Sequence, residues 1–237
     1  MRKGSDEMTG FNWIEDLSPS ASEALREKSR IRSLPGGITL YRQRDPMTEV
    51  FQIVSGAVRQ CILTADGQEV LIYIYRPGDV IGDSAVASNE SYSINFITRG
   101  KSVLRVWGAR DFNDLRARYH DIEAAIVAQT SRRLKGALQI IEELLTLPVA
   151  ARIASRFVSL AQMQKSEKVA VSLSLSQSDI GLMVGSARPN VNRAIRELRE
   201  LGLIETDYGR ILVKNREGLV RYINDHGRQT KNNIDDE

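Results

Sequence analysis

The spacing of apolar and polar positions changes character along the chain. From Ile38 to Trp107, short runs rich in β-branched and aromatic residues alternate with turn signals, a spacing typical of an antiparallel barrel or jelly roll. The runs are ITLY, VFQIVS, AVRQCIL, VLIYIY, YSINFIT and SVLRVW. From Asp111 the pattern becomes helical and continues without proline to Leu147, before Pro148. We therefore expect a β-rich N-terminal domain, with an opening helix around Ser20–Ser29, followed by one long helix.

The predicted long helix carries a narrower apolar seam. Val127, Leu134 and Ile141 recur every seven residues, and Leu138 and Leu145 each follow four residues behind a member of that series. Such spacing is typical of helices that pair in a coiled coil, so the seam predicts a parallel homodimer. The alternative is that the seam packs on the β-rich domain of its own chain.

Between Ser176 and Val213 the pattern predicts two short amphipathic helices around a glycine turn. Ser176 and Asp179 have the spacing of a capping box, Gly185 suits the end of a helix, and Ser186 can cap the next one. In the second helix one side is apolar, with Val191, Ala194, Ile195, Leu198 and Leu201.

A hairpin follows these two helices. Ile204–Thr206 is predicted to pair with Arg210–Val213 across a Tyr208-Gly209 turn. Two helices and a hairpin in this order predict a winged helix-turn-helix. Beyond the hairpin, the pattern predicts one more helix from Lys214 to Asp225 and then a polar tail.

The second helix carries side chains suited to reading DNA. Pro189 fits only the first turn of a helix, so Arg188 lies at the leading tip. Arginines such as Arg188 and Arg193 can grip guanine, and the side chains of Asn190 and Asn192 can pair with adenine in the major groove. The alternative is a small helical subdomain whose arginines form a solvated face.

Composition sets limits on these expectations. The 237 residues, of which 42% are hydrophobic and 27% charged, suit two folded domains. The net charge of +3 lies in the second part of the chain, because residues 148–237 hold 14 Lys+Arg against 11 Asp+Glu, whereas residues 1–147 hold 19 of each. With no long apolar run and no signal peptide, we expect a cytoplasmic protein that does not contact a membrane.

The sequence offers few groups for metal or redox chemistry. Cys61 is the only cysteine, which excludes a four-cysteine zinc or iron–sulfur site within one chain. We expect Cys61 to be an ordinary strand thiol, with a redox switch as the alternative. His120 and His226 are not accompanied by further residues at metal-ligand spacing, so no metal site is expected. No nucleophile–base pair is evident in the sequence, so no enzyme is expected either.

Jelly roll, long helix and winged helix-turn-helix in this order resemble the bacterial family of the cyclic AMP receptor protein and the fumarate–nitrate reduction regulator. The resemblance spans roughly residues 17–213 and is carried by SQSDIGLMVGSARPNVNRAIRELRELGLI, AQTSRRL, ARIASRFVSLA and PGDVIGD. It implies an α+β protein with a cyclic-nucleotide-binding-like antiparallel β-barrel (jelly roll) at 1–110, a dimerisation helix at 111–147 and a winged helix-turn-helix at 148–219. Residues 220–237 are then the helix end and polar tail.

The resemblance implies a homodimeric transcription regulator that binds palindromic double-stranded DNA and contacts RNA polymerase. It places base contacts at Arg188, Pro189 and Arg193, and phosphate contacts at Gln177 and Ser178. In the receptor that names the family, a glutamate occupies the place of Pro189 and accepts a hydrogen bond from cytosine. Proline has no acceptor there, so we expect a different half-site that is still anchored on guanine.

The resemblance also implies an effector pocket. Its residues here are Gly82, Asp83, Ser84, Tyr92, Ser93, Ala137 and Leu138. Asp83 is one methylene shorter than the family's glutamate, and Tyr92 replaces the arginine that binds phosphate. Ala137 and Leu138 replace the hydroxyl residues that face adenine.

These departures predict that the effector, a small molecule if one exists, is not cyclic AMP. The alternative is a true cyclic-nucleotide-responsive regulator with a divergent phosphate-binding cassette. The cofactor stays unknown. The family's iron–sulfur regulators need an N-terminal cysteine cluster that this chain lacks, and no histidine before His120 supports a haem.

Overall fold

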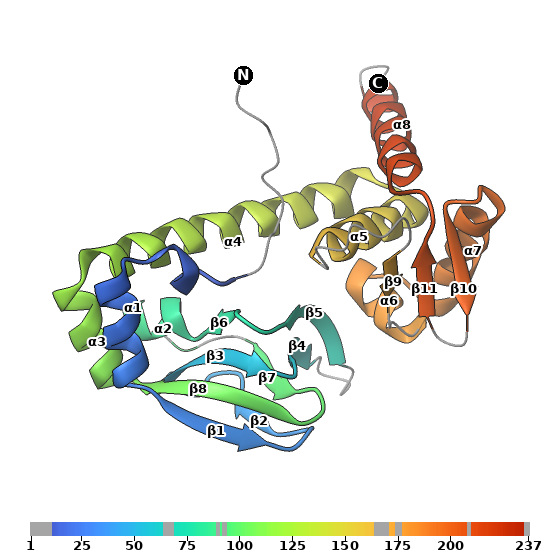
Figure 1. Ribbon diagram of the computed structural model, residues 1–237. Coiled ribbons are helices and arrows are strands. Elements are labelled where there is room, and N and C mark those ends of the chain that lie inside the picture. Colours follow the sequence, from blue (N-terminus) through green and yellow to red (C-terminus); the bar gives the residue numbers. More distant parts are fainter. Residues whose placement is uncertain are drawn as a thin grey trace. The chain divides into compact units, whose positions relative to one another are not determined.

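The computed structural model describes residues 11–63, 69–88, 91, 94–163, 171–173, 177–207 and 210–234. They divide into an N-terminal unit that ends at Leu134 and a C-terminal unit that begins at Lys135 (Figure 1). Helix α4, His120–Thr146, contributes its first part to the N-terminal unit and its last part to the C-terminal unit.

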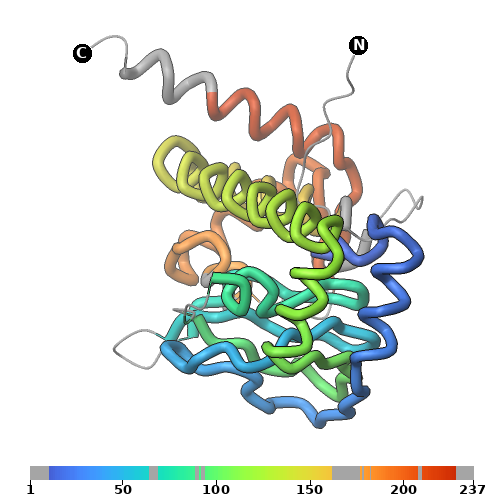
Figure 2. Tube along the Cα trace, turned by 90° about the vertical axis from the view of Figure 1, so that its left-hand side faces the viewer, coloured from blue at the N-terminus to red at the C-terminus, as the bar shows by residue number. Residues whose placement is uncertain are grey.

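The N-terminal unit is a jelly roll of two four-stranded antiparallel sheets, with strand orders β1-β8-β3-β6 and β2-β7-β4-β5. The chain crosses between these layers repeatedly, as the blue-to-green tube shows (Figure 2). The strands are β1 (Arg30–Leu34), β2 (Thr39–Tyr41), β3 (Glu49–Ser55), β4 (Val58–Leu63), β5 (Glu69–Tyr75), β6 (Val80–Ile81), β7 (Asn95–Thr98) and β8 (Ser102–Gly108). The alternating apolar positions of these strands, among them Phe51, Phe96 and Leu104, fill the core between the sheets.

The six predicted apolar runs each form a strand, whereas β1 and β6 were not predicted. Strand β1 shows no alternation of buried apolar and exposed polar residues. Ile31 is exposed, and its neighbours Arg30 and Arg32 form ion pairs with Glu49. Strand β6 has only two residues. Both lie at the edges of one sheet, where pairing with a neighbour, rather than a local apolar pattern, defines the strand.

Helices cover one end of the jelly roll. They are the 3-10 helix η1 (Ile14–Asp16), α1 (Pro19–Glu27), α2 (Asp83–Ser88), α3 (Ala109–Arg118) and α4. Helix α1 begins where predicted, because the Ser18 hydroxyl accepts a hydrogen bond from the Ala21 N–H and Pro19 occupies the first turn.

The prediction of one unbroken helix from Asp111 to Leu147 is wrong. Tyr119 has an extended backbone, with φ −118° and ψ 100°, and separates α3 from α4. The apolar positions Phe112, Leu115, Ile122 and Ile126 keep a helical spacing across this break, so the sequence gives no sign of it. The break lets α3 pack on β8 and β3 while α4 continues in another direction.

The C-terminal unit joins helices to a small antiparallel sheet of order β10-β11-β9. After α4 come α5 (Val149–Met163), β9 (Val171–Leu173), α6 (Gln177–Val184), α7 (Arg188–Glu200), β10 (Ile204–Asp207), β11 (Arg210–Val213) and α8 (Arg216–Ile234). Phe157, Ile180, Val191, Leu198 and Leu219 are buried at the centre of this unit. Helix α8 continues to Ile234, so most of the predicted polar tail is helical.

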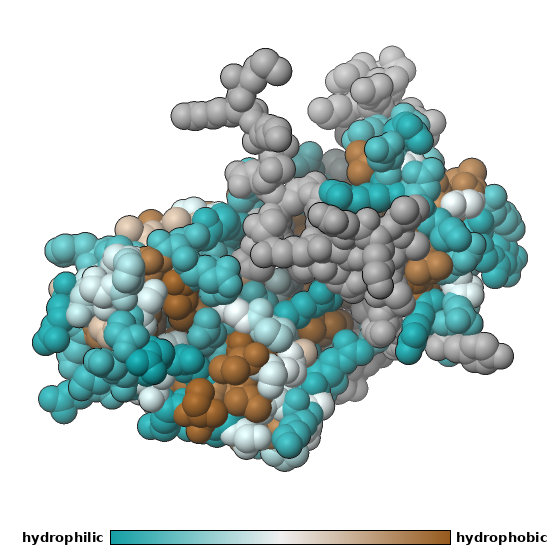
Figure 3. All heavy atoms as spheres, viewed as in Figure 1, coloured by the Kyte–Doolittle hydropathy of each residue, from teal (hydrophilic) through white to brown (hydrophobic). Residues whose placement is uncertain are grey.

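Some apolar side chains remain on the surface. The viewed face of the jelly roll shows a group of them among hydrophilic neighbours (Figure 3), and Ile31 and Val54 are exposed on its strands. None of the described helices combines the length and the apolar character that a membrane-spanning segment needs.

Candidate functional site

The turn between α6 and α7 is tight, and glycines make it possible. Gly185 has φ +60° at the end of α6, as its sequence position predicted. The Ser186 N–H donates to the Gly181 carbonyl oxygen at 3.0 Å, and a Cβ on Gly181 would lie only 2.9 Å from the Ser186 carbonyl oxygen. The angle between the two helices is therefore fixed by the backbone itself.

Helix α7 starts one residue later than the Ser186 cap requires. Its N-cap is Ala187, in an extended conformation with no side-chain hydrogen bond, so the predicted capping by Ser186 is wrong. Pro189 lies in the first turn, as predicted. Among the described residues, no side chain accepts a hydrogen bond from the free N–H groups at the start of α7. The positive end of the helix dipole therefore favours an anion there.

The faces of α7 are chemically distinct. Val191, Ala194, Ile195 and Leu198 are buried against the core, as predicted, whereas Leu201 is exposed. The exposed side chains of α7 include Arg188 and Pro189 in its first turn, and Asn190, Arg193 and Arg196 after them. Among the ion pairs between described residues, none involves these arginines.

Asn192 differs from the other predicted base contacts. Its side chain is half-buried, and its Oδ1 atom is enclosed without a hydrogen-bond partner among the described residues. It lies between the buried and exposed faces of α7, so it is less accessible than Arg188, Asn190 or Arg193.

The residues predicted to touch phosphates lie at the first turn of α6. Gln177 is exposed at its start. The side chain of Ser178 lies outside the described residues.

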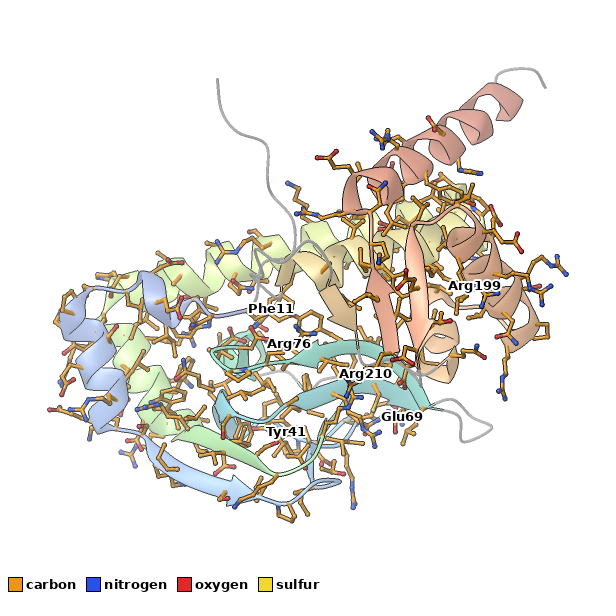
Figure 4. The ribbon with its side chains drawn as sticks, turned by 45° about the vertical axis from the view of Figure 1, so that its right-hand side comes forward. Phe11, Tyr41, Glu69, Arg76, Arg199 and Arg210 are labelled. Carbon is orange, nitrogen blue, oxygen red and sulfur yellow. The ribbon has the colours of Figure 1, made fainter. Side chains whose placement is uncertain are left out.

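The hairpin pairs as predicted, with Ile204 opposite Val213 and Asp207 opposite Arg210. The turn residues Tyr208 and Gly209 lie outside the described residues. Arg210 is exposed at the turn end of β11 (Figure 4), and Lys214 Nζ lies 3.1 Å from Glu205 Oε1. This hairpin is the wing of a winged helix-turn-helix.

A hydrogen bond links α8 to α7, a contact that the sequence did not predict. The Tyr222 hydroxyl donates a hydrogen bond to Glu197 of α7, and the His226 ring centroid lies 4.1 Å from that of Tyr222. Burial raises the pKa of Tyr222 well above its ordinary value, so the hydroxyl keeps its proton. No local signal links Tyr222 to a residue so far back in the sequence.

In the N-terminal unit, the predicted effector-pocket residues begin at the end of β6. Gly82 has φ +92°, and a Cβ there would lie 2.8 Å from the Glu49 carbonyl oxygen. The Asp83 side chain is fully buried. One carboxylate oxygen accepts from Trp13 Nε1 at 2.8 Å, and the other accepts from Arg133 Nη1 at 2.7 Å. Neither partner was predicted, because both lie far from Asp83 in the chain.

The other predicted pocket residues are Ser84, Tyr92, Ser93, Ala137 and Leu138. Tyr92 and Ser93 lie outside the described residues. Ala137 and Leu138 are exposed on α4. Ser84 is half-buried and lines an open groove of about 350 Å³, which also reaches Val127 and Leu134 of the seam.

The apolar seam of α4 is exposed along its whole length. The exposed fractions are 57% for Val127, 61% for Leu134, 57% for Leu138, 51% for Ile141 and 79% for Leu145. Val127 and Leu134, the two seam residues in the same unit as the jelly roll, do not pack on it. A row of exposed aliphatic side chains at coiled-coil spacing is a surface that a second helix can cover.

Cys61 is buried in β4. Burial raises the pKa of its thiol to about 11, which keeps it protonated and unreactive, as expected of an ordinary strand thiol. His120 begins α4 and His226 lies on α8. Within the described part of the chain, no group of three or more His, Cys, Asp or Glu side chains is placed to hold a metal ion.

Comparison with known protein families agrees with this architecture. Residues 31–119 match the model of the cyclic nucleotide-binding domain, and residues 151–222 match that of the Crp-like helix-turn-helix domain. The chain is 26% identical over 219 residues to the CRP-like cAMP-activated global transcriptional regulator of Mycobacterium tuberculosis, covering 88% of this chain and 94% of that protein. It is also 26% identical over 187 residues to the cAMP-activated global transcriptional regulator CRP of Escherichia coli, covering 77% and 88%.

Solved structures share the fold. FixK2 from Bradyrhizobium japonicum superposes with a TM-score of 0.71 at 23% identity, covering 81% of this chain and 96% of that one. A CooA mutant from Carboxydothermus hydrogenoformans also gives 0.71, at 20% identity, covering 91% and 96%. The predicted order of jelly roll, long helix and winged helix-turn-helix is confirmed, and this chain belongs to the bacterial transcription-regulator family of the cyclic AMP receptor protein and the fumarate–nitrate reduction regulator.

Proposed function

We propose that this protein is a homodimeric transcription regulator that reads a palindromic DNA site with α7 and is controlled by the state of its jelly roll. The observation that carries the proposal is the exposed face of α7, on which Arg188, Asn190 and Arg193 project from a helix buried on its other side. Arginine and asparagine on such a helix match the donor and acceptor pattern of the major groove. The matched relatives are transcriptional regulators, which supports a non-enzymatic role.

The exposed seam of α4 supports the homodimer. A parallel pair of α4 helices relates two winged helix-turn-helix units by a two-fold axis, the symmetry of a palindromic operator. RNA polymerase is the further partner that the family implies.

For the effector we favour something other than cyclic AMP. Asp83 has its carboxylate oxygens bonded to Trp13 and Arg133, which leaves the carboxylate poorly placed to receive a ribose hydroxyl. The second candidate is a regulator that responds to cyclic nucleotides through a divergent cassette. The names of the M. tuberculosis and E. coli relatives, both described as cAMP-activated, favour it.

DNA binding is tested by measuring affinity for a selected duplex over a range of salt concentrations. The variant that combines Arg188→Ala with Arg193→Ala removes two predicted guanine contacts from each protomer and four from the dimer. We expect a loss on the order of 10³ or more in affinity, since each good base contact contributes about 1–3 kcal/mol.

The matched control combines Arg199→Ala with Arg221→Ala. It removes the same charge from exposed positions, and Arg199 lies roughly 16 Å along α7 from the tip, at about 1.5 Å per residue. We expect the control to retain most of the affinity at moderate salt. Equal losses in the two double variants would contradict the assignment of the reading face.

Thermal unfolding in the presence of cyclic AMP and cyclic GMP separates the two effector candidates. A ligand that binds the folded state tightly must raise the unfolding temperature, by mass action. We expect no shift with either nucleotide at millimolar concentration; a clear, saturable shift would establish the second candidate.

A further inference from the structure

The segment Phe11–Trp13 is bound to the sensor jelly roll like a peptide ligand. The Phe11 N–H donates to the Asp79 carboxylate, and the Phe11 carbonyl accepts from the Val80 N–H at 3.1 Å. The side chains of Phe11 and Trp13 are 6% and 0% exposed. The segment is thus held along β6 by its backbone and buried by its aromatic rings.

The Phe11 ring lies in a cage of aromatic and cationic groups. Its centroid is 4.5 Å from that of Tyr73 and 5.3 Å from that of Tyr75, both on β5. The guanidinium carbon of Arg133 lies over the ring, 4.8 Å from its centroid. Tyr75 in turn packs edge-on against Phe96, at 5.8 Å, so the Phe11 ring ends an aromatic column that begins in the core.

The same segment is linked to α4 through the buried carboxylate of Asp83. Trp13 Nε1 and Arg133 Nη1 each donate to Asp83, at 2.8 Å and 2.7 Å. Arg133 also donates to the Val80 carbonyl oxygen at 3.0 Å. Arg133 on α4 therefore contacts Phe11, β6 and Asp83 together, which makes it a direct connection between the segment and the helix.

We propose that the jelly roll binds its own segment Phe11–Trp13 as a tethered ligand, in a site that accepts a planar aromatic ring beside a guanidinium. Occupation of this site fixes Arg133, and with it the first part of α4, without a diffusible effector. A tethered ligand is present at a high effective concentration, so a free aromatic compound competes poorly with it. The proposal rests on the proposed function in one respect. It takes the affinity of the protein for DNA as the measure of how firmly α4 is held.

The test uses the full-length variant Phe11→Ala with toluene, which is the free equivalent of the deleted side chain. Apolar cavities left by such truncations bind small aromatic molecules. We expect Phe11→Ala to lower both the unfolding temperature and DNA affinity, the latter at least about fivefold, the lower end of typical coupling between sites. Toluene should then raise the unfolding temperature of Phe11→Ala and restore its DNA affinity, while leaving the wild type unchanged.

Phe51→Ala is the matched control. It removes a ring of the same size that is also buried, at 1% exposed, but that packs on Tyr41 and lies beneath the Arg32 guanidinium. We expect it to lower the unfolding temperature while the folded protein keeps its DNA affinity. A loss of DNA affinity equal to that of Phe11→Ala would overturn the proposal.

Trp13→Phe gives a second measurement if Phe11→Ala folds poorly. It keeps an aromatic ring but removes the Nε1 donor to Asp83, and we expect a DNA affinity at least about threefold below that of the wild type with the fold intact. Wild-type DNA affinity in both variants, or the failure of toluene to stabilise Phe11→Ala, would overturn the proposal. A failure of the proposed function is distinct, because it appears as wild-type DNA binding that is insensitive to Arg188 and Arg193.

Discussion

The exposure of the α4 seam allows the effect of a seam substitution on dimerisation to be calculated. Leu138 is 57% exposed. Full burial of a leucine side chain contributes about 1.5–3 kcal/mol, so covering that fraction contributes roughly 1–1.5 kcal/mol per copy. A symmetric dimer contains the residue twice, and Leu138→Ala should therefore weaken association by about 2–3 kcal/mol, or roughly 30- to 150-fold in Kd.

Sedimentation equilibrium over a wide range of protein concentrations measures this change directly. Leu144→Ala is the control, because Leu144 is also exposed, at 45%, and lies on the same helix. Six residues separate the two, which places Leu144 about 120° around the helix from Leu138. Leu144 flanks the seam three residues after Ile141, so we expect the control to weaken association by less than about tenfold.

The reasoning is refuted if Leu138→Ala dimerises as tightly as the wild type while its circular dichroism shows an intact fold. It is refuted equally if both leucine variants weaken the dimer to the same extent. In the first case the seam does not contact a second copy, and in the second the contact is not the narrow one that coiled-coil spacing implies.

Three further predictions concern the two units separately. Glu143→Gln should destabilise the C-terminal unit by about 1–3 kcal/mol in urea unfolding, because the buried Glu143 accepts hydrogen bonds from Ser155 Oγ at 2.6 Å and from Arg156; no loss would mean that the pair is solvated. Gly185→Ala should cost about 1 kcal/mol through its φ of +60°, whereas Gly108→Ala, with φ −67° and open space for a Cβ, should be neutral by the same measurement. Native Cys61 should react with iodoacetamide at pH 8 at least tenfold more slowly than in urea, because burial raises its pKa to about 11. The stability that this proton contributes is fully present below about pH 9 and is lost as the pH rises toward 11, and a flat unfolding free energy across that range would contradict it.

Local sequence determined the two faces of α7 and the turn and hairpin beside it. The spacing of Val191, Ile195 and Leu198 predicted the buried face of α7, and that face alone left Arg188 and Arg193 outside. Pro189, Gly185 and the hairpin pairing were predicted for the same reason. Each depends on dihedral angles or side-chain spacing within a few residues, so neighbours in the sequence suffice to decide it.

Contacts between distant segments were decided by tertiary structure alone. The break at Tyr119 leaves the apolar spacing intact and arises because α3 packs on the sheet. Asp83 obtains its buried partners from Trp13 and Arg133, and Tyr222 reaches back to Glu197. A buried polar group must find a partner, but its sequence neighbours do not reveal which one, because that partner is selected by the packing of whole elements. The sequence by itself therefore determined which helix exposes the arginines, and only the fold decided which side chains surround Asp83.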